Sequence, residues 1–196
     1  TGSGTSSVTD GSSVTVDQSS LTLTVRELRS NNSASTARAV VGDLVTLAIT
    51  ASKTILTLTV AFSVVGGAAV STSRVTVLGS GAVYSASFIV DGSDADGVIA
   101  FTVSYTDVSG NAGVPSSSSS DGHAVLIDNT APTLTGVSLS SSPVPAGPGG
   151  TITLAFNSSE PLGSDLAVTI EGHTVTATCD ASLSCVALHT VNASTD

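Results

Sequence analysis

The fold is decided by a stretch that occurs twice, first as Asp10-Gly11-Ser12-Ser13-Val14-Thr15-Val16-Asp17 and again as Asp121-Gly122-His123-Ala124-Val125-Leu126-Ile127-Asp128. The match continues without a gap, so residues 18–24 align with residues 129–135 at an offset of 111. Self-similarity at a fixed offset is the signature of a repeated structural unit. A unit of roughly 110 residues has the size of one immunoglobulin-type sandwich.

Two further blocks extend the repeat. Residues 42–49 align with residues 149–156 at an offset of 107, so a connecting loop is four residues shorter in the second copy. A fainter match pairs residues 84–90 with residues 185–191. The chain therefore holds one complete copy and the first part of another.

The residue pattern within the complete copy predicts β-strands. Residues 44–50, 55–64 and 98–105 alternate between apolar and polar side chains, which is typical of half-buried strands, and glycine-rich turns separate them. The β-branched residues Val and Thr are abundant, and only 10% of the residues are charged. The predicted core positions are Val45, Leu47, Ile49, Leu56, Leu58, Val60, Phe62, Val64, Ile99, Phe101, Val103 and Tyr105. We therefore expect an all-β protein built from two-sheet sandwiches.

Several of these segments resemble bacterial-type immunoglobulin-like repeats. Val45-Thr46-Leu47 and Ile152-Thr153-Leu154-Ala155-Phe156-Asn157-Ser158-Ser159-Glu160-Pro161 look like the "VTLTFTASE" strand of that family. Tyr105-Thr106-Asp107-Val108-Ser109-Gly110-Asn111 resembles its "TDxxGN" turn. Ile127-Asp128-Asn129-Thr130-Ala131-Pro132-Thr133 resembles its junction between repeats. The resemblance implies tandem immunoglobulin-like β-sandwiches, and it covers most of the chain.

Such repeats occur in large cell-surface, adhesive and fibre-forming proteins, so the resemblance implies an extracellular scaffold or spacer role. The expected domains are residues 21–130 as a complete sandwich and residues 131–196 as an incomplete one, preceded by residues 1–20. We expect a structural protomer of a glycoprotein fibre. The alternative is a segment of an adhesin that binds a sugar or a protein through its loops, because a fold does not by itself specify a function.

The second copy lacks counterparts of the strands at 98–105 and 123–128, while residues 10–17 resemble a last strand with no domain before it. One hypothesis is that Val14 and Val16 belong to a donor strand that completes the second domain of a neighbouring copy, giving head-to-tail self-assembly. The other is that the missing strands follow in a longer tandem array. Two strands are missing, and residues 1–8 are too rich in Gly and Ser to predict a second donor.

Covalent modifications are predicted at two kinds of site. The sequons Asn31-Asn32-Ser33, Asn157-Ser158-Ser159 and Asn192-Ala193-Ser194 are candidate N-glycosylation sites, all at expected loops or strand ends. Cys179 and Cys185 are the only cysteines, and in a secreted chain we expect a disulfide between them within a hairpin at 174–190.

The sequence contains few residues in patterns typical of metal binding or catalysis. The acidic run at 91–97 looks superficially like a calcium loop, so Asp94, Asp96 and Asp107 are a weak calcium candidate, although a hard cation needs six or more oxygens. The three histidines, His123, His173 and His189, lie on different predicted strands and suggest no metal or catalytic group. No cofactor is expected, and no enzyme signature is present.

The charge distribution limits the partners. The first 75 residues carry five basic and four acidic residues, whereas the rest of the chain carries 11 acidic residues and no Lys or Arg. Nucleic acid is therefore an improbable partner. No stretch is apolar enough to span a bilayer. The chain begins with Thr1 and shows no signal peptide, so we expect a processed piece of a longer extracellular or cell-surface protein.

Overall fold

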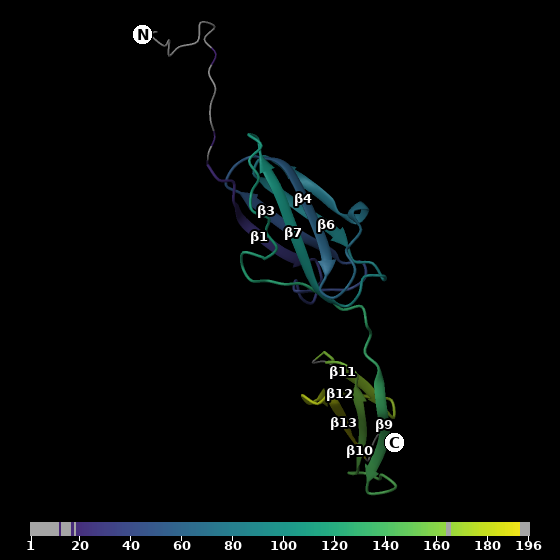
Figure 1. Cartoon of the computed structure of the whole chain (residues 1–196). Helices are drawn as coiled ribbons and strands as arrows, with labels where there is room; N and C mark the ends of the chain where they lie inside the picture. Colours follow the sequence, from purple (N-terminus) through teal and green to yellow (C-terminus); the bar gives the residue numbers. More distant parts are fainter. Residues whose placement is uncertain (1–11, 13–16, 18, 164–165, 193–196) are drawn as a thin grey trace, which may run out of the picture. The chain divides into compact units, whose positions relative to one another are not determined.

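The computed structural model describes residues 12, 17, 19–163 and 166–192 (Figure 1). Over these residues the protein is all-β, and its only helical segment is one short 3₁₀ turn, Thr72–Arg74. The chain divides into two compact units, Thr1–Asn129 and Thr130–Asp196, which we call unit 1 and unit 2.

Unit 1 is a β-sandwich of two four-stranded sheets. The first sheet has the order β1-β3-β6-β5, and the second has the order β2-β8-β7-β4. All neighbouring strands are antiparallel except β2 and β8, which are parallel. The strands are β1 (Leu23–Ser30), β2 (Arg38–Ala39), β3 (Leu44–Ala51), β4 (Ile55–Val64), β5 (Thr76–Ser80), β6 (Val83–Ile89), β7 (Gly97–Asp107) and β8 (Leu126–Ile127).

The core of unit 1 follows the predicted alternation with one exception. Every predicted position on β3 and β7 is buried. On β4, however, Leu56 is 61% exposed and Ile55 is buried instead. The pairing of β4 with β7 shifts register between Ile55 and Thr57, and such an irregularity turns the side chains before it to the other face. The prediction of Leu56 as a core residue was therefore wrong.

Unit 2 is a single five-stranded antiparallel sheet with the order β11-β12-β13-β10-β9. Its strands are β9 (Leu134–Ser142), β10 (Thr151–Ser158), β11 (Leu166–Ile170), β12 (His173–Cys179) and β13 (Ser184–Thr190). The buried apolar residues of this unit are Ile152, Phe156, Ile170, Ala177, Cys185, Ala187 and Val191. Over the part of unit 2 that the structure describes, no second sheet faces this one.

The three-stranded centres of the two units have the same register. Leu47 on β3 pairs with Leu28 on β1 and with Ala86 on β6. Leu154 on β10 pairs in the same way with Leu139 on β9 and with Ala187 on β13. We call two residues counterparts when they hold the same place in this register.

Three pairs of hydrogen bonds recur with the register. The Thr22 amide donates to Ser52 Oγ at 3.1 Å, and the Thr133 amide donates to Ser159 Oγ at 2.9 Å. The Gly42 and Gly149 amides donate to the carbonyls of Val90 and Val191, both at 2.9 Å. The Asp43 amide donates to the Val40 carbonyl, as the Gly150 amide does to the Gly147 carbonyl, which makes Ala39 and Ala146 counterparts.

The predicted disulfide is present. Cys179 and Cys185 lie directly opposite each other on β12 and β13 and are bonded. We expect the double substitution Cys179→Ser, Cys185→Ser to destabilise unit 2 by about 2 kcal/mol, because the bond restricts the unfolded chain over a short loop. Urea unfolding of the oxidised protein, the reduced protein and the variant measures this. Equal stability of all three would contradict it.

Candidate functional site

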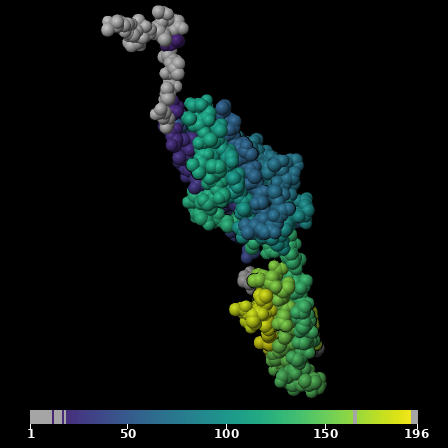
Figure 2. Space-filling view, viewed as in Figure 1, coloured from purple at the N-terminus to yellow at the C-terminus, as the bar shows by residue number. Residues whose placement is uncertain are grey.

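One apolar face of unit 2 lacks the cover that its counterpart has in unit 1. Directly paired residues in a sheet point to the same face, so Leu139 lies on the same face as Leu154, which packs on the core. Leu139 is nevertheless 66% exposed, whereas its counterpart Leu28 is 1% exposed. In unit 1 this face is covered by the second sheet. β9 belongs to the surface of unit 2 that is green in Figure 2.

A groove of about 350 Å³ opens at this face. It is lined by Leu139, Ser140, Ser141, Pro145, Ala146, Ile152 and Glu171. Its apolar walls are Leu139, Ala146 and Ile152, whose counterparts in unit 1 are Leu28, Ala39 and Val45. We call it the β9 groove.

The same three positions in unit 1 belong to a closed core. Leu28, Ala39 and Val45 are all buried in one cluster that also contains Val125 and Ile127. Ile127, on β8, is the direct pairing partner of Ala39. The walls of the β9 groove thus correspond to the residues that enclose Val125 and Ile127, at β8, in unit 1.

The free edge of β11 is the second open element of unit 2. In unit 1, β4 pairs along nine positions with β7, from Ile55 with Asp107 to Val64 with Ile99. β11 follows β10 as β4 follows β3, but over the described residues it pairs only with β12. An exposed edge presents unpaired N–H and C=O groups to any strand that can add to it.

At the N-terminal end of unit 1, Asp17 is tied to the sandwich. Lys53 Nζ lies 2.9 Å from both carboxylate oxygens of Asp17 and 3.8 Å from Asp107 Oδ2. Asn111 Nδ2 donates to the Asp17 carbonyl at 3.2 Å and to Asp107 Oδ2 at 3.0 Å. Side-chain contacts thus hold residue 17 against the rest of unit 1.

These contacts lower carboxylate pKa values. The pKa of Asp17 falls to about 2, mainly because the Ser19 hydroxyl donates to it and also because of Lys53. The pKa of Asp107 is lowered first by the Asn111 side chain, and that of Asp94 first by Arg74. The ionised forms are therefore the ones that the fold stabilises.

Unit 1 should lose stability only at acidic pH. Because these folded-state pKa values lie below the unfolded value of 3.8, the contribution is complete above about pH 4 and is lost as the pH falls toward 2. We expect a Tm that is flat from pH 7 to 5 and falls between pH 4 and 2. Ser19→Ala should flatten that fall. A Tm that drops mainly between pH 7 and 5 would contradict this assignment.

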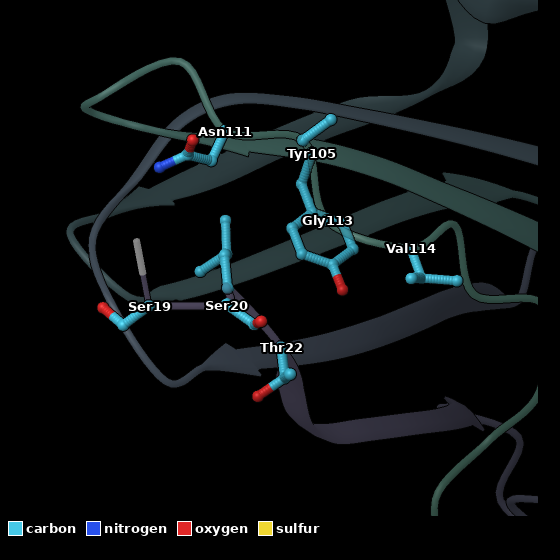
Figure 3. Close-up of a pocket in the computed structure, with 9 residues that line it drawn as sticks. Ser19, Ser20, Thr22, Tyr105, Asn111, Gly113 and Val114 are labelled. Carbon is cyan, nitrogen blue, oxygen red and sulfur yellow. The ribbon is translucent and has the colours of Figure 1, made fainter. Parts of the chain in front are cut away.

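A shallow pocket of about 460 Å³ lies at the same end of unit 1 (Figure 3). Residues 19–22 form one part of its wall and residues 111–114 another, together with Tyr105. Gly113 lies against the Tyr105 ring so closely that a Cβ there would be 2.0 Å from Cε2. The polar lining is mostly Ser, Thr and Asn, and the Asn111 side-chain amide already donates twice. No carboxylate, imidazole, amine or thiol is among the lining side chains.

The calcium candidates are not brought together. Asp94 holds Arg74 through both carboxylate oxygens at 2.6 and 2.7 Å. Asp96 accepts from the Asn129 amide at 2.6 Å, and Asp107 accepts from Asn111. Among the described residues, no three His, Cys, Asp or Glu side chains are grouped as a metal ion would require.

Unit 2 contains a histidine pair that the sequence pattern did not predict. The rings of His173 and His189, on β12 and β13, stack with centroids 4.6 Å apart, and His189 is buried. His173 Nδ1 and His189 Nε2 have no hydrogen-bond partner in the described structure. The two residues are 16 positions apart, so only the β12–β13 pairing brings them together.

The remaining predicted site residues are the sequon asparagines and the candidate donor strand. Asn31 follows β1, Asn157 is the penultimate residue of β10, and Asn192 follows β13; all three are exposed. Val14 and Val16 of the candidate donor strand lie outside the described residues.

The chain matches no protein-family model, and the comparison with curated proteins finds no significant match. No helix in the described part of the chain is long and apolar enough to cross a bilayer.

Proposed function

We propose that this chain is a structural protomer of an extracellular glycoprotein fibre that assembles head-to-tail through tandem immunoglobulin-like domains. The observation that carries the proposal is the exposure of Leu139 and the β9 groove on a face whose counterpart in unit 1 is core. A soluble chain that keeps an apolar groove of this kind is a candidate for association.

The strand order of unit 1 supports the immunoglobulin-like part of the proposal. Constant-type immunoglobulin domains place strands A, B, E and D in one sheet and C, F and G in the other. The orders β1-β3-β6-β5 and β2-β8-β7-β4 fit that arrangement, with β2 as a short first-strand segment beside the last strand. The shared register and hydrogen bonds support unit 2 as a second copy in which β9, β10 and β13 correspond to β1, β3 and β6.

Strand donation is the proposed link between copies. Residues 10–17 align with residues 121–128, and Val14 and Val16 thereby correspond to the fully buried Val125 and Ile127. In this proposal they fill the β9 groove of a second copy. Because donor and acceptor surfaces differ, the contact is heterologous and generates a filament unless the rotation closes a ring.

The anchoring of Asp17 supports this direction of assembly. Its hydrogen bonds to Lys53 and Asn111 attach the end of the donor segment to the sandwich of unit 1. A pulling force on the donated strand would therefore be transmitted to that sandwich. The disulfide and the three exposed sequons suit an extracellular location, where glycans shield the surface.

The proposal is tested with the full chain, secreted from a eukaryotic host that attaches N-glycans. We expect filaments by negative-stain electron microscopy and an intact mass above that of the polypeptide. Val16→Asp should abolish the filaments, and the matched control Thr15→Asp, at the position of the half-buried Leu126, should retain them. A chain with residues 1–17 intact that stays monomeric at all concentrations would overturn the proposal.

An adhesin that binds a sugar or protein through its loops is the alternative. The pocket of Figure 3 is the feature that favours it, since Tyr105 supplies an aromatic ring beside polar groups. The ring is buried and covered by Gly113, however, so it offers little stacking surface. Glycan binding that Asn111→Ala removes, without any filaments, would favour this alternative.

A further inference from the structure

Unit 2 carries a histidine where the core of unit 1 carries a phenylalanine. His189 pairs directly with Ile152 on β10. Phe88 holds the same place in unit 1, where it pairs with Val45 on β3. Both side chains are buried, with 6% of His189 and 2% of Phe88 exposed. A residue that can take up a proton therefore occupies a core position of the repeat.

The rings that contact these two side chains come from different sheets. In unit 1 the ring of Phe62 on β4, in the second sheet, lies against Phe88 with the centroids 5.0 Å apart. In unit 2 the ring of His173 on β12, in the same sheet, stacks on His189 with the centroids 4.6 Å apart and an interplanar angle of 21°. The core position is thus covered by a second sheet in unit 1 and by another histidine in unit 2.

Both histidines lie on the face of the sheet that carries the β9 groove. His189 pairs with Ile152, which is a wall of that groove. His173 pairs with Ile170, which is buried in the same apolar cluster as Ile152. Directly paired residues point to the same face of a sheet. A second copy that fills the groove would therefore also remove water from around the histidine pair.

The histidine pair has few polar neighbours. His173 Nδ1 and His189 Nε2 are buried and have no hydrogen-bond partner in the described structure. Glu171, in the turn before His173, lines the groove, but no ion pair joins it to either ring over the described residues. The other described carboxylates of unit 2, Glu160 and Asp180, follow β10 and β12 at the opposite end of the sheet. Unit 2 contains no Lys or Arg, and its core cluster is apolar.

The stacked arrangement does not suit a metal ion. The nitrogen ligands of a zinc ion must all point to one centre at about 2.0–2.1 Å, whereas the lone pairs of nearly parallel rings lie in separate planes. No third His, Cys, Asp or Glu side chain is grouped with the pair in the part of the chain that the structure describes. A proton, rather than a metal ion, is therefore the species that this pair can take up.

We propose that His173 and His189 make the covering of this face by a second copy dependent on pH. Histidine changes its charge between pH 5 and 8. In the free chain charged rings keep contact with water, since His173 is only partly buried. A second copy over the groove removes that water, and stacked charged rings without a counter-ion are costly there. Acid thus favours the free chain and neutral pH the assembled form. The inference rests on the proposed assembly and adds its regulation.

Critical concentrations for assembly of the full chain at pH 7.5 and pH 5.5 test the pH dependence. We expect the wild-type value to be at least about tenfold higher at pH 5.5, since assembly that releases one proton per copy weakens by up to about tenfold per pH unit. His189→Phe, which installs the residue type of Phe88, should change less than about twofold between the two pH values. His173→Gln, at a partly buried position, should also lose most of the response. His123→Gln, the matched control at an exposed position of unit 1, should keep the full response.

Thermal melts of the unassembled chains at both pH values show that each variant is folded and separate assembly from folding. Equal wild-type critical concentrations at pH 7.5 and pH 5.5 would overturn the pH dependence and leave the proposed assembly standing. A full response in both His173→Gln and His189→Phe would also overturn it, because other groups would then be responsible. A wild-type chain that assembles at neither pH would overturn the proposed assembly, and its regulation with it.

Discussion

Leu28→Ala should destabilise unit 1 by about 2–5 kcal/mol, whereas Leu139→Ala should change the stability of unit 2 in the unassembled chain by less than about 0.5 kcal/mol. The two leucines hold the same place in the sheet register, beside Leu47 and Leu154. Only Leu28 is enclosed by a second sheet, so only its truncation leaves a cavity. Each variant thus serves as the control for the other.

Urea unfolding followed by hydrogen exchange, resolved by unit, measures both effects in dilute solution. The expected difference in free energy comes from the second sheet, which covers Leu28 and not Leu139. The two residues are otherwise alike, because both are leucines at the same register position of corresponding strands. A loss of more than about 2 kcal/mol for Leu139→Ala in the monomer would mean that the face is already closed within one chain.

Leu139→Asp should stop assembly while leaving the monomer folded. In the free chain the carboxylate at position 139 would stay largely in water, since the leucine it replaces is 66% exposed. In the fibre it would lie in the β9 groove against the donated strand, and a charge without a partner is costly there. We expect the critical concentration to rise by about 100-fold or more.

Leu188→Asp is the matched control for this substitution. Leu188 is 59% exposed and lies between the buried Ala187 and His189 on β13, so it faces the other side of the same sheet. The Leu188→Asp variant should have a critical concentration for assembly close to that of wild type, as measured by sedimentation velocity across a dilution series. Equal loss of assembly in both variants would show that general surface charge, and not the groove, is responsible.

Alternation predicted the strands and most of the core of unit 1, because side chains on a strand have a period of two and the core lies on one side. The prediction for Leu56 was wrong because the register of β4 shifts between Ile55 and Thr57. This shift is a property of the pairing with β7 and cannot be recognised in the sequence of β4 alone. The Cys179–Cys185 disulfide was predictable because the chain has two cysteines, close in sequence on adjacent predicted strands, so each has one possible partner within the chain.

The open face of unit 2 was only partly predictable. Aligning the two copies predicted counterparts in unit 2 for only some of the strands of unit 1. The exposure of Leu139 also depends on the sheet that β11 joins. In unit 1 the corresponding strand, β4, pairs with β7, whereas β11 pairs with β12 at the edge of the single sheet. The stacked histidines were missed for a similar reason, because the β12–β13 pairing that joins them is a tertiary contact.

A cross-link between copies tests the central claim most directly. Ile127 pairs with Ala39 in unit 1, so Val16 of one copy should lie beside Ala146 of the next at a separation that a disulfide spans. Two preparations that differ in mass tag, one carrying Val16→Cys and the other Ala146→Cys, are mixed and oxidised. The account predicts a disulfide that joins the two tags. Fibres that form without this cross-link, or a bond that forms only when both cysteines are in one chain, would contradict it.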